Sequence, residues 1–386
     1  MINKNRLIRL TQKLIRIKSE NPPGDESRIA AYIKEYFEKL GLEPRIYEFK
    51  KKRSNIVVSL KGKNAKHSLL ITPHLDTVPA GRSWKSDPFG AKIKKNRIYG
   101  LGATDCKGNL ACALEAISSL LEDSMALDYD LIFAATADEE TGSSLGLVPL
   151  LGNGILNPDA AVILDSDNCD IIITQKGLIH LKVKLQGKRA HGAYPSRGIN
   201  AVDLAGDIIK DLKSHRFTYR KNKYLKPPTV NTGTIRGGDK VNIVADWCEF
   251  ELDFRFLPGT QANQVLKQIR CIVNKYIKKY FRHKTSYSNA VKFEIENIQK
   301  PYYINERHSL VRGLLRAMKV LRVKGIIKGS EGATVITFFQ DKKIPAVATG
   351  FGSRGCAHVA NEYANIDNLF KGARVLEEFL KNYTFN

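Results

Sequence analysis

The chain has 386 residues, of which 43% are hydrophobic, and its formal net charge is +23. This length exceeds what one ordinary hydrophobic core supports, so it predicts two domains. No run of about 18 consecutive apolar residues occurs, which excludes a conventional membrane-spanning helix.

The first part of the chain alternates helical and extended segments. Two amphipathic helices open it, the second over about residues 26–40, and a later helix is expected over 109–121. Short apolar runs between the helices are typical of strands buried on both faces. These runs cover residues 53–60, 68–73, 130–137 and 159–165. This order predicts a doubly wound α/β sheet.

The segment 177–297 has a different pattern. Its expected elements follow the βαββαβ order of a ferredoxin-like fold. The strands are expected at 177–187, 229–238, 248–256 and 290–298, and the helices at 200–215 and 261–281. After this segment the earlier pattern resumes, with a strand over 343–352. We therefore expect a catalytic domain made of 1–176 and 298–386, interrupted by an inserted domain at 177–297.

The positive charge allows two interpretations. A field of this size attracts nucleic acid, anionic membranes or acidic substrates. The lysines, however, are spread along the whole chain, without a basic block that is interleaved with aromatic residues. We favour a general lysine bias of the proteome and keep a basic nucleic-acid-binding protein as the alternative from another class.

The N-terminus and the cysteines indicate a cytoplasmic protein. Residues 1–19 are basic and alternate at helical spacing, and they lack the apolar run and cleavage site of a signal peptide. The six cysteines are scattered without a CxxC pair, which suits a reducing compartment better than a disulfide framework.

Potential metal ligands follow several of the expected strands. In open α/β sheets, ligands bind outside the carboxyl ends of the strands. The residues at these ends are His74, Asp76, Asp105, Asp138, Glu139, Glu140, Asp165 and His358. Each one alone has an ordinary explanation, such as a packed histidine, a helix cap or a solvated turn. We expect all of them at one edge of one sheet, where such concentrated negative charge would be costly without a cation. Carboxylates and imidazoles suit Zn²⁺ or a similar divalent ion.

These stretches together resemble the M20 family of metallopeptidases and deacylases. The matching stretches are HLDTVP at 74–79, GATDCKGN at 102–109, ADEETG at 137–142, the strand end at Asp165, GKRAHGAYPSRGINA at 187–201 and AHVANEY at 357–363. The resemblance covers essentially the whole chain and is greatest to the acetylornithine deacetylase/succinyl-diaminopimelate desuccinylase branch. It implies that the inserted segment is a lid or dimerisation domain and that the protein is a homodimer.

The resemblance also implies a pair of metal sites for two divalent ions, Zn²⁺ or alternatively Co²⁺. His74 would bind one ion, with Asp76 orienting its imidazole. Asp105 would bridge both ions, and the sites would be completed by Glu140, Asp165 and His358. Glu139 would stay unligated and act as the general base, taking a proton from water and passing it to the leaving amine.

In the substrate region the resemblance is less specific. His191 would stabilise the oxyanion, in dimeric members from the partner subunit, and the alternative is a polar loop histidine. Arg255 would pair with a substrate carboxylate, and the alternative is an arginine on the strand surface. Asn242 would contact substrate, with a similar alternative. Gly350 and Gly352 would let the backbone approach the substrate.

Three positions depart from the family pattern. Leu101 lies between two glycines where many relatives have an arginine. Cys106 replaces a frequent methionine beside Asp105, and we expect it to pack rather than to bind metal. Val335 replaces a frequent aspartate in a late loop, so the wall on the substrate side is uncertain.

The resemblance implies a metal-dependent amide hydrolase that removes an acyl group from a small N-acyl amino acid. The alternative is an exopeptidase of the same family, a carboxypeptidase or a di/tripeptidase that acts on short peptides. Neither function involves a membrane.

Overall fold

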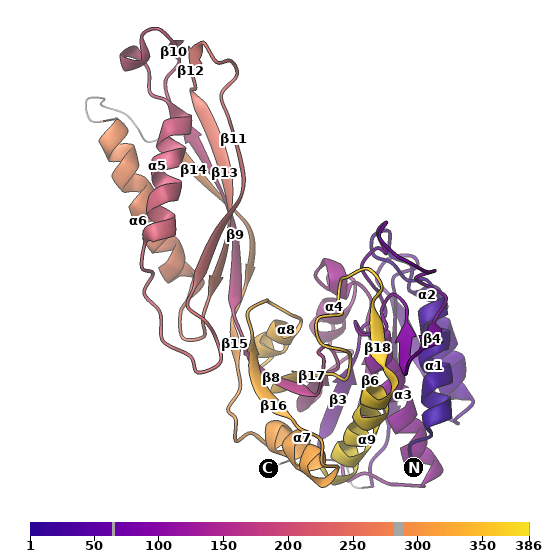
Figure 1. Ribbon diagram of the computed structural model, residues 1–386. Helices are drawn as coiled ribbons and strands as arrows, with labels where there is room; N and C mark the ends of the chain where they lie inside the picture. Colours follow the sequence, from indigo (N-terminus) through magenta and orange to yellow (C-terminus); the bar gives the residue numbers. More distant parts are fainter. Residues whose placement is uncertain (64–65, 282–288, 386) are drawn as a thin grey trace. The chain divides into compact units, whose positions relative to one another are not determined.

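A computed structural model, shown in Figure 1, describes residues 1–63, 66–281 and 289–385. The chain forms two compact units, which are described separately. Unit 1 contains Met1–Ile173, Ile304–Lys328 and Val335–Asn386, and unit 2 contains Thr174–Tyr303 and Gly329–Thr334. The short segment Gly329–Thr334 therefore groups with the inserted segment, and no sequence pattern indicated this.

Unit 1 is a mixed α/β structure built on one large sheet with the strand order β1-β2-β6-β3-β7-β17-β8. The strands are β1 Arg45–Glu48, β2 Ser54–Leu60, β3 Ser68–Thr72, β6 Asp130–Ala135, β7 Ala160–Ile163, β8 Asp170–Gln175 and β17 Ala346–Thr349, and β16 (Ile326–Ser330) also pairs with β8. The central strands β6, β3, β7 and β17 are parallel, and β2 and β8 join them antiparallel. Strands β7 and β17 are buried along their whole length, which explains their unbroken apolar sequences.

The chain reverses its direction of travel across the sheet at β3. It passes from β3 through α3 to the neighbouring β6, and then returns past β3 to β7 on the other side. Right-handed crossovers in opposite directions put their connecting helices on opposite faces of a sheet. Ligand sites form outside the carboxyl ends of the strands at such a reversal.

The helices of unit 1 are α1 Lys4–Arg16, α2 Ser27–Glu38, α3 Lys107–Glu122, α4 Leu147–Gly152, α7 Ser309–Val320, α8 Ile336–Asp341 and α9 Ile366–Asn382. Helix α3 packs against α1 and α9, and its residues from Lys107 to Leu120 are buried on all sides. This burial explains why the α3 sequence lacks a polar face.

A small separate sheet in unit 1 corrects one expectation. Its order is β18-β5-β4, formed by Tyr363–Asn365, Arg97–Tyr99 and Lys92–Lys94. The sequence analysis put Asp105 at the end of a strand of the main sheet, and this is wrong. Strand β5 ends at Tyr99, and the chain then turns through Gly102, whose φ is +80°, to reach Asp105 just before α3.

Unit 2 follows the order β9-α5-β11-β13-α6-β14 along the chain. Its elements are β9 Gly177–Gln186, α5 Ala201–Ser214, β11 Thr229–Gly237, β13 Trp247–Phe256, α6 Ala262–Tyr280 and β14 Val291–Gln299. The antiparallel sheet has the strand order β11-β13-β9-β14. Smaller elements are β10 Ala190–His191, which pairs with β12 Ile243–Val244, the 3₁₀ turn Pro195–Arg197, and β15 Tyr302–Tyr303, which pairs with the end of β8.

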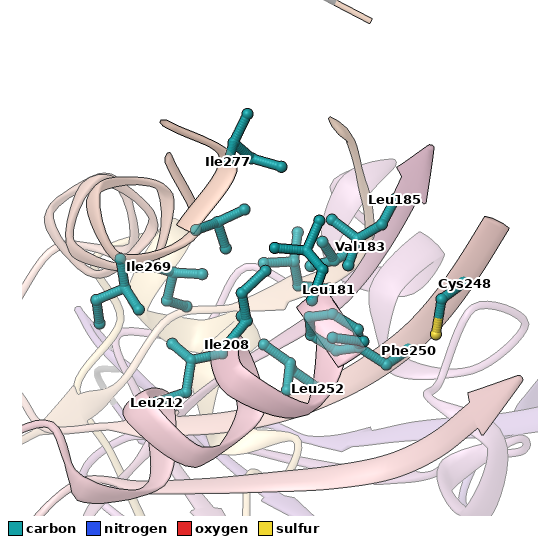
Figure 2. Close-up of a cluster of buried hydrophobic side chains, with 14 of the residues drawn as sticks. Leu181, Val183, Leu185, Ile208, Leu212, Cys248, Phe250, Leu252, Ile269 and Ile277 are labelled. Atoms are coloured by element: carbon teal, nitrogen blue, oxygen red, sulfur yellow. The ribbon is translucent and has the colours of Figure 1, made fainter. Parts of the chain in front are cut away.

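The core of unit 2 lies between the sheet and its two helices, which cover the same face (Figures 1 and 2). Alternate residues of β9 and β13 point into it, as the two-residue period of a strand requires. These are Leu181, Val183 and Leu185 from β9 and Cys248, Phe250 and Leu252 from β13. Ile208 and Leu212 of α5 and Ile269 and Ile277 of α6 close the cluster.

Across the described residues, the structure contains no helix that is both long and apolar enough to cross a membrane.

Candidate functional site

Three adjacent strands of unit 1 end at the candidate site. His74 follows β3, Glu139 and Glu140 follow β6, and Asp165 follows β7. A backbone hydrogen bond joins the segments that follow β3 and β6, since the N–H of Leu75 donates to the backbone oxygen of Thr136 across 2.8 Å. Parallel strands thus deliver an imidazole and three carboxylates to one edge of the sheet.

Asp105 reaches the same cluster from the turn before α3. Its Oδ1 lies 3.0 Å from Nε2 of His74, and its Oδ2 lies 3.1 Å from Nε2 of His358. Burial alone would raise the pKa of Asp105, but the hydrogen bonds with His358 and His74 outweigh it and hold this pKa below its usual value. One carboxylate therefore faces two imidazoles with different oxygen atoms.

His74 is buried, and the surrounding backbone fixes its orientation. Its Nδ1 lies 2.9 Å from the backbone oxygen of Asp76, while the nearest carboxylate oxygen of Asp76 is 3.5 Å away. The Nδ1 proton is therefore directed to the backbone oxygen, and Nε2 faces Asp105, where its hydrogen bond with the ionised carboxylate requires a second ring proton. The sequence analysis gave the orienting contact to the Asp76 side chain, whereas its main-chain oxygen is closer.

The carboxylate of Asp76 has a different set of partners. It accepts hydrogen bonds from the backbone N–H groups of Glu139 and Glu140 and from Nδ2 of Asn21, at 3.1, 3.2 and 2.8 Å. Because these donors and the interaction with His74 stabilise its ionised form, the pKa of Asp76 stays below its usual value despite burial, which alone would raise it. Asp76 thereby holds the two glutamates of the turn after β6.

The carboxylates at this edge repel one another. Burial raises the pKa of Asp165 to about 7, and the nearby Asp105 carboxylate adds to this increase. Burial and the Asp165 carboxylate also raise the pKa of Glu139 well above its usual value. A divalent cation among these groups would favour their ionised forms.

His358 lies in the loop between β17 and β18. Its Nε2 is 3.1 Å from Glu140 as well as 3.1 Å from Asp105. These hydrogen bonds raise the pKa of His358 to about 10. Its side chain is 53% exposed, whereas that of Glu140 is 5% exposed, so His358 forms the solvent side of the cluster.

The grouped donor atoms fit a divalent metal. In one group His74, Asp105 and Glu140, and in another His74, Glu139 and Asp165, have ligand atoms within 4.8 Å of one another. This nitrogen and carboxylate set suits Zn²⁺ and related ions. Glu139 lies as close as the expected ligands, so geometry alone does not separate a base from a ligand here.

The sequence analysis assigned no role to Glu362, although it lies within the AHVANEY stretch. This buried carboxylate accepts hydrogen bonds from the backbone N–H groups of Gly102, Thr104 and Asp105, at 2.8, 2.7 and 3.0 Å. Burial raises the pKa of Glu362 to about 7, although the three donors oppose the shift. Glu362 thus holds the turn that carries Asp105.

A second supporting group surrounds the turn after β6. The buried Arg53 guanidinium donates to both carboxylate oxygens of Glu26, at 2.8 and 2.9 Å, and to Asp138 at 2.9 Å. Asp138 has a positive φ of 66° and accepts a 3.0 Å hydrogen bond from the N–H of Leu145. Asp138 therefore supports the fold of the turn and has no position among the grouped metal donors.

The remaining candidates, His191, Asn242 and Arg255, belong to unit 2. His191 is exposed on β10, and its Nδ1 accepts a 3.0 Å hydrogen bond from the N–H of Ala193, so its proton lies on Nε2. The backbone oxygen of Asn242 accepts from the N–H of Gly192 at 2.8 Å, which brings Asn242 beside His191. Arg255 is bound through Nε and Nη2 to both oxygens of Asp253, at 2.7 and 2.8 Å.

Close packing within the chain explains the two glycines that follow β17. A Cβ atom on Gly350 would lie 1.7 Å from the backbone oxygen of Ser166, and one on Gly352 would lie 2.5 Å from Thr104. Contacts within the chain therefore require glycine at both positions, independently of any substrate.

Cys106 is buried beside the backbone of His74. Its Sγ donates to the His74 oxygen and accepts from the His74 N–H, at 3.3 and 3.2 Å. Burial raises the pKa of this thiol to about 12, so it stays protonated at neutral pH. Cys106 packs, and it is absent from both groups of potential ligands in the described residues.

Comparison with known proteins identifies relatives over almost the whole length of the chain. An uncharacterized metallohydrolase of Methanocaldococcus jannaschii is 30% identical, with 97% of this chain and 98% of that protein aligned. An acetylornithine deacetylase of Edwardsiella ictaluri is 28% identical over 82% of this chain and 80% of that protein.

The fold has close counterparts among solved structures. The crystal structure of a tripeptidase from Staphylococcus aureus matches with a TM-score of 0.79 and 24% identity, over 99% of this chain and 98% of that one. The model of peptidase family M20/M25/M40 matches residues 70–382. The chain therefore belongs to peptidase family M20/M25/M40, and it is a metallohydrolase that acts on amide or peptide bonds.

Proposed function

We propose that this protein is a dinuclear metal hydrolase that removes the acyl group from a small N-acyl amino acid, in the manner of acetylornithine deacetylase or succinyl-diaminopimelate desuccinylase. The position of Asp105 is the observation that carries this proposal. Its two carboxylate oxygens lie 3.0 Å from Nε2 of His74 and 3.1 Å from Nε2 of His358, which supports Asp105 as a ligand that both ions would share. In this proposal Asp165 and Glu140 complete the two sites.

The ions in this proposal are Zn²⁺ or Co²⁺. When bound, they would polarise the scissile carbonyl group and lower the pKa of the attacking water. Glu139 would accept a proton from that water and later donate it to the leaving amine. Burial and the Asp165 carboxylate raise the pKa of Glu139, which is the direction that a group accepting a proton requires.

His191 would stabilise the developing oxyanion. Its Nδ1 accepts a hydrogen bond from the N–H of Ala193, so the neutral ring has its proton on Nε2 and can donate it to the oxyanion. Arg255 would bind the substrate carboxylate after exchanging Asp253 for it, since both offer two oxygens to the same guanidinium. Asn242 would contact substrate beside His191.

A substrate panel tests the proposal. Enzyme loaded with Zn²⁺ or Co²⁺ is incubated with N-acetylornithine, N-succinyl-diaminopimelate, other N-acyl amino acids, dipeptides and tripeptides, and the release of free amine is measured. Hydrolysis of an N-acyl amino acid in preference to the peptides is expected. Inert acyl compounds beside cleaved peptides would replace the deacylase with an exopeptidase. A loaded enzyme that cleaves no amide would overturn the function altogether.

We further propose that unit 2 is a lid and dimerisation domain. Its outer strands β11 and β14 carry exposed apolar side chains, including Ile235 at 51% and Ile295 at 46% exposure. In a dimer His191 would act in the partner's site. Mixing two inactive variants, Glu139→Gln and His191→Ala, should then restore activity, because one site of the mixed dimer has both groups intact. No recovery in mixed dimers would show that His191 acts within its own chain or has no role.

A further inference from the structure

A hollow of about 780 Å³ lies at the β4–β5 hairpin of unit 1. Its lining shares no residue with the candidate metal cluster. The basic lining residues are Lys85, Lys92, Lys94, Lys95 and Arg97, and no lining residue is acidic. These five side chains, called the basic hairpin pocket below, are all exposed.

The register of the hairpin puts its charges on one face. Lys92 pairs with Tyr99, and Lys94 pairs with Arg97. Side chains two residues apart on a strand share a face, and directly opposite residues share it too. Lys94 and Arg97 are therefore like charges in direct opposition, an arrangement that destabilises a sheet unless an anion lies between them.

The protein supplies no such anion within its described residues. None of the five basic side chains forms an ion pair there, whereas other cations of this unit do, such as Lys4 with Asp367 at 2.6 Å. Asp367, which also accepts a hydrogen bond from Asn96 at the hairpin turn, is thus already neutralised. The positive charge of the pocket is left for a ligand.

Stacking fixes the direction of Arg97. Its guanidinium lies over the ring of Tyr363, 4.2 Å from the ring centre, and Tyr363 pairs with Tyr99 across β18 and β5. A guanidinium held by its face directs its N–H groups sideways, and Arg97 uses one of them in a hydrogen bond with Tyr99. The remaining N–H groups match phosphate oxygens. The pocket thus has one oriented guanidinium group and four exposed ammonium groups.

We propose that the basic hairpin pocket binds a small oligophosphate, a compound with two or more linked phosphate groups. Phosphate oxygens match both ammonium and guanidinium donors, and five cations exceed the need of a single phosphate. The volume falls in the range of small-molecule sites. A nucleic-acid strand would need exposed rings for base stacking, whereas Arg97 covers Tyr363 and Tyr99 is half-buried.

Calorimetric titration with the magnesium complex of inorganic tripolyphosphate tests this site. The pocket variant is Lys94→Gln/Arg97→Gln. The control is Lys50→Gln/Lys51→Gln, which removes the same charge from exposed lysines outside the pocket. We expect the pocket variant to bind about tenfold more weakly or worse, and the control to bind as the wild type does. Any ligand at the metal cluster contributes equally to both variants.

A thermal measurement gives an independent readout. Tripolyphosphate should raise the unfolding midpoint of the wild type and of the control more than that of the pocket variant. Without ligand, the pocket variant loses both the like-charge pair and the stacking of Arg97 on Tyr363, so each protein is compared with its own midpoint in the absence of tripolyphosphate.

Four results would overturn the proposal. Equal weakening in both variants would assign binding to the general positive field, and unchanged binding in the pocket variant would remove the site. Orthophosphate that binds as tightly as tripolyphosphate would exclude the need for linked phosphates. An oligouridylate of about 20 nucleotides that binds more tightly than tripolyphosphate, and loses affinity in the pocket variant, would assign the pocket to nucleic acid.

Discussion

The carboxylate of Asp76 accepts a hydrogen bond from the backbone N–H of Glu140 across 3.2 Å. It also accepts from the N–H of Glu139, and the Asp76 main-chain oxygen faces Nδ1 of His74. One residue therefore connects the loop after β3 to the turn after β6. These contacts, together with the parallel strands β3 and β6, hold the imidazole near both glutamates.

Replacing Asp76 with Asn tests that connection. An amide has one acceptor oxygen where the carboxylate has two, and its NH₂ group would face an N–H donor of the turn. We expect metal affinity or activity to fall by about 10–100-fold. Chelator competition measures the affinity, and circular dichroism checks that the variant is folded. Wild-type affinity together with wild-type turnover would remove Asp76 from any positioning role.

The two neighbouring glutamates should respond differently to the same change. Glu139→Gln removes the proposed base, so turnover should fall by about 10²–10⁴-fold while metal content stays at the wild-type level. Glu140→Gln removes a proposed ligand beside His358 and should lower metal content. The paired variants control each other, because each replaces a carboxylate with an amide in the same turn. Metal loss from Glu139→Gln alone would mean that the two roles are exchanged.

Strand periodicity predicted much of the fold. The apolar runs at 68–73, 130–137 and 159–165 became β3, β6 and β7, because strands buried on both faces are apolar without interruption. The residues that follow these strands meet because parallel strands end together. His74 and Asp165 could therefore be grouped from the sequence alone.

Other contacts depend on backbone turns, which the spacing of apolar residues in the sequence does not predict. Asp105 comes from the turn before α3, and Glu362 holds that turn with acceptors for three N–H groups. In the sequence, the residues of the basic hairpin pocket are part of the lysines spread along the chain. Only the pairing register of β4 and β5 brings Lys94 opposite Arg97. Sequence spacing carries no information on which chain segments a turn brings together.

Glu362→Gln should affect metal binding through the turn of Asp105. A glutamine amide group would face one of the three N–H donors, leaving a buried donor unpaired at a cost of about 1–3 kcal/mol. We expect a lower unfolding midpoint and a metal affinity reduced by about 10–100-fold. Glu43→Gln, at an exposed position, is the matched control. A variant with the lower midpoint but the affinity of the wild type would show that Glu362 stabilises the fold alone.

The start of α7 should be sensitive to pH. His308 is its N-cap, and its Nδ1 accepts a 3.2 Å hydrogen bond from the N–H of Leu310, which requires a neutral ring. Burial lowers the pKa of His308 from its usual value of 6.5. The unfolded helix start therefore binds a proton at higher pH than the folded one. The capping hydrogen bond of His308 therefore stabilises the start of α7 fully above pH 6.5. This stabilisation is lost as the pH falls through 6.5 toward the pKa of His308 in the folded protein.

Hydrogen exchange of the amides of Ser309–Val320 measures this local effect, after correction for the intrinsic pH dependence of exchange. Protection of α7 in the wild type should decrease below the usual histidine pKa. His308→Asn keeps an acceptor at the N-cap without a titrating group, so its protection should change less with pH. Parallel pH profiles for both proteins would contradict this, because the loss would then come from another group. The comparison separates the cap from the remaining histidines, which are identical in the two proteins.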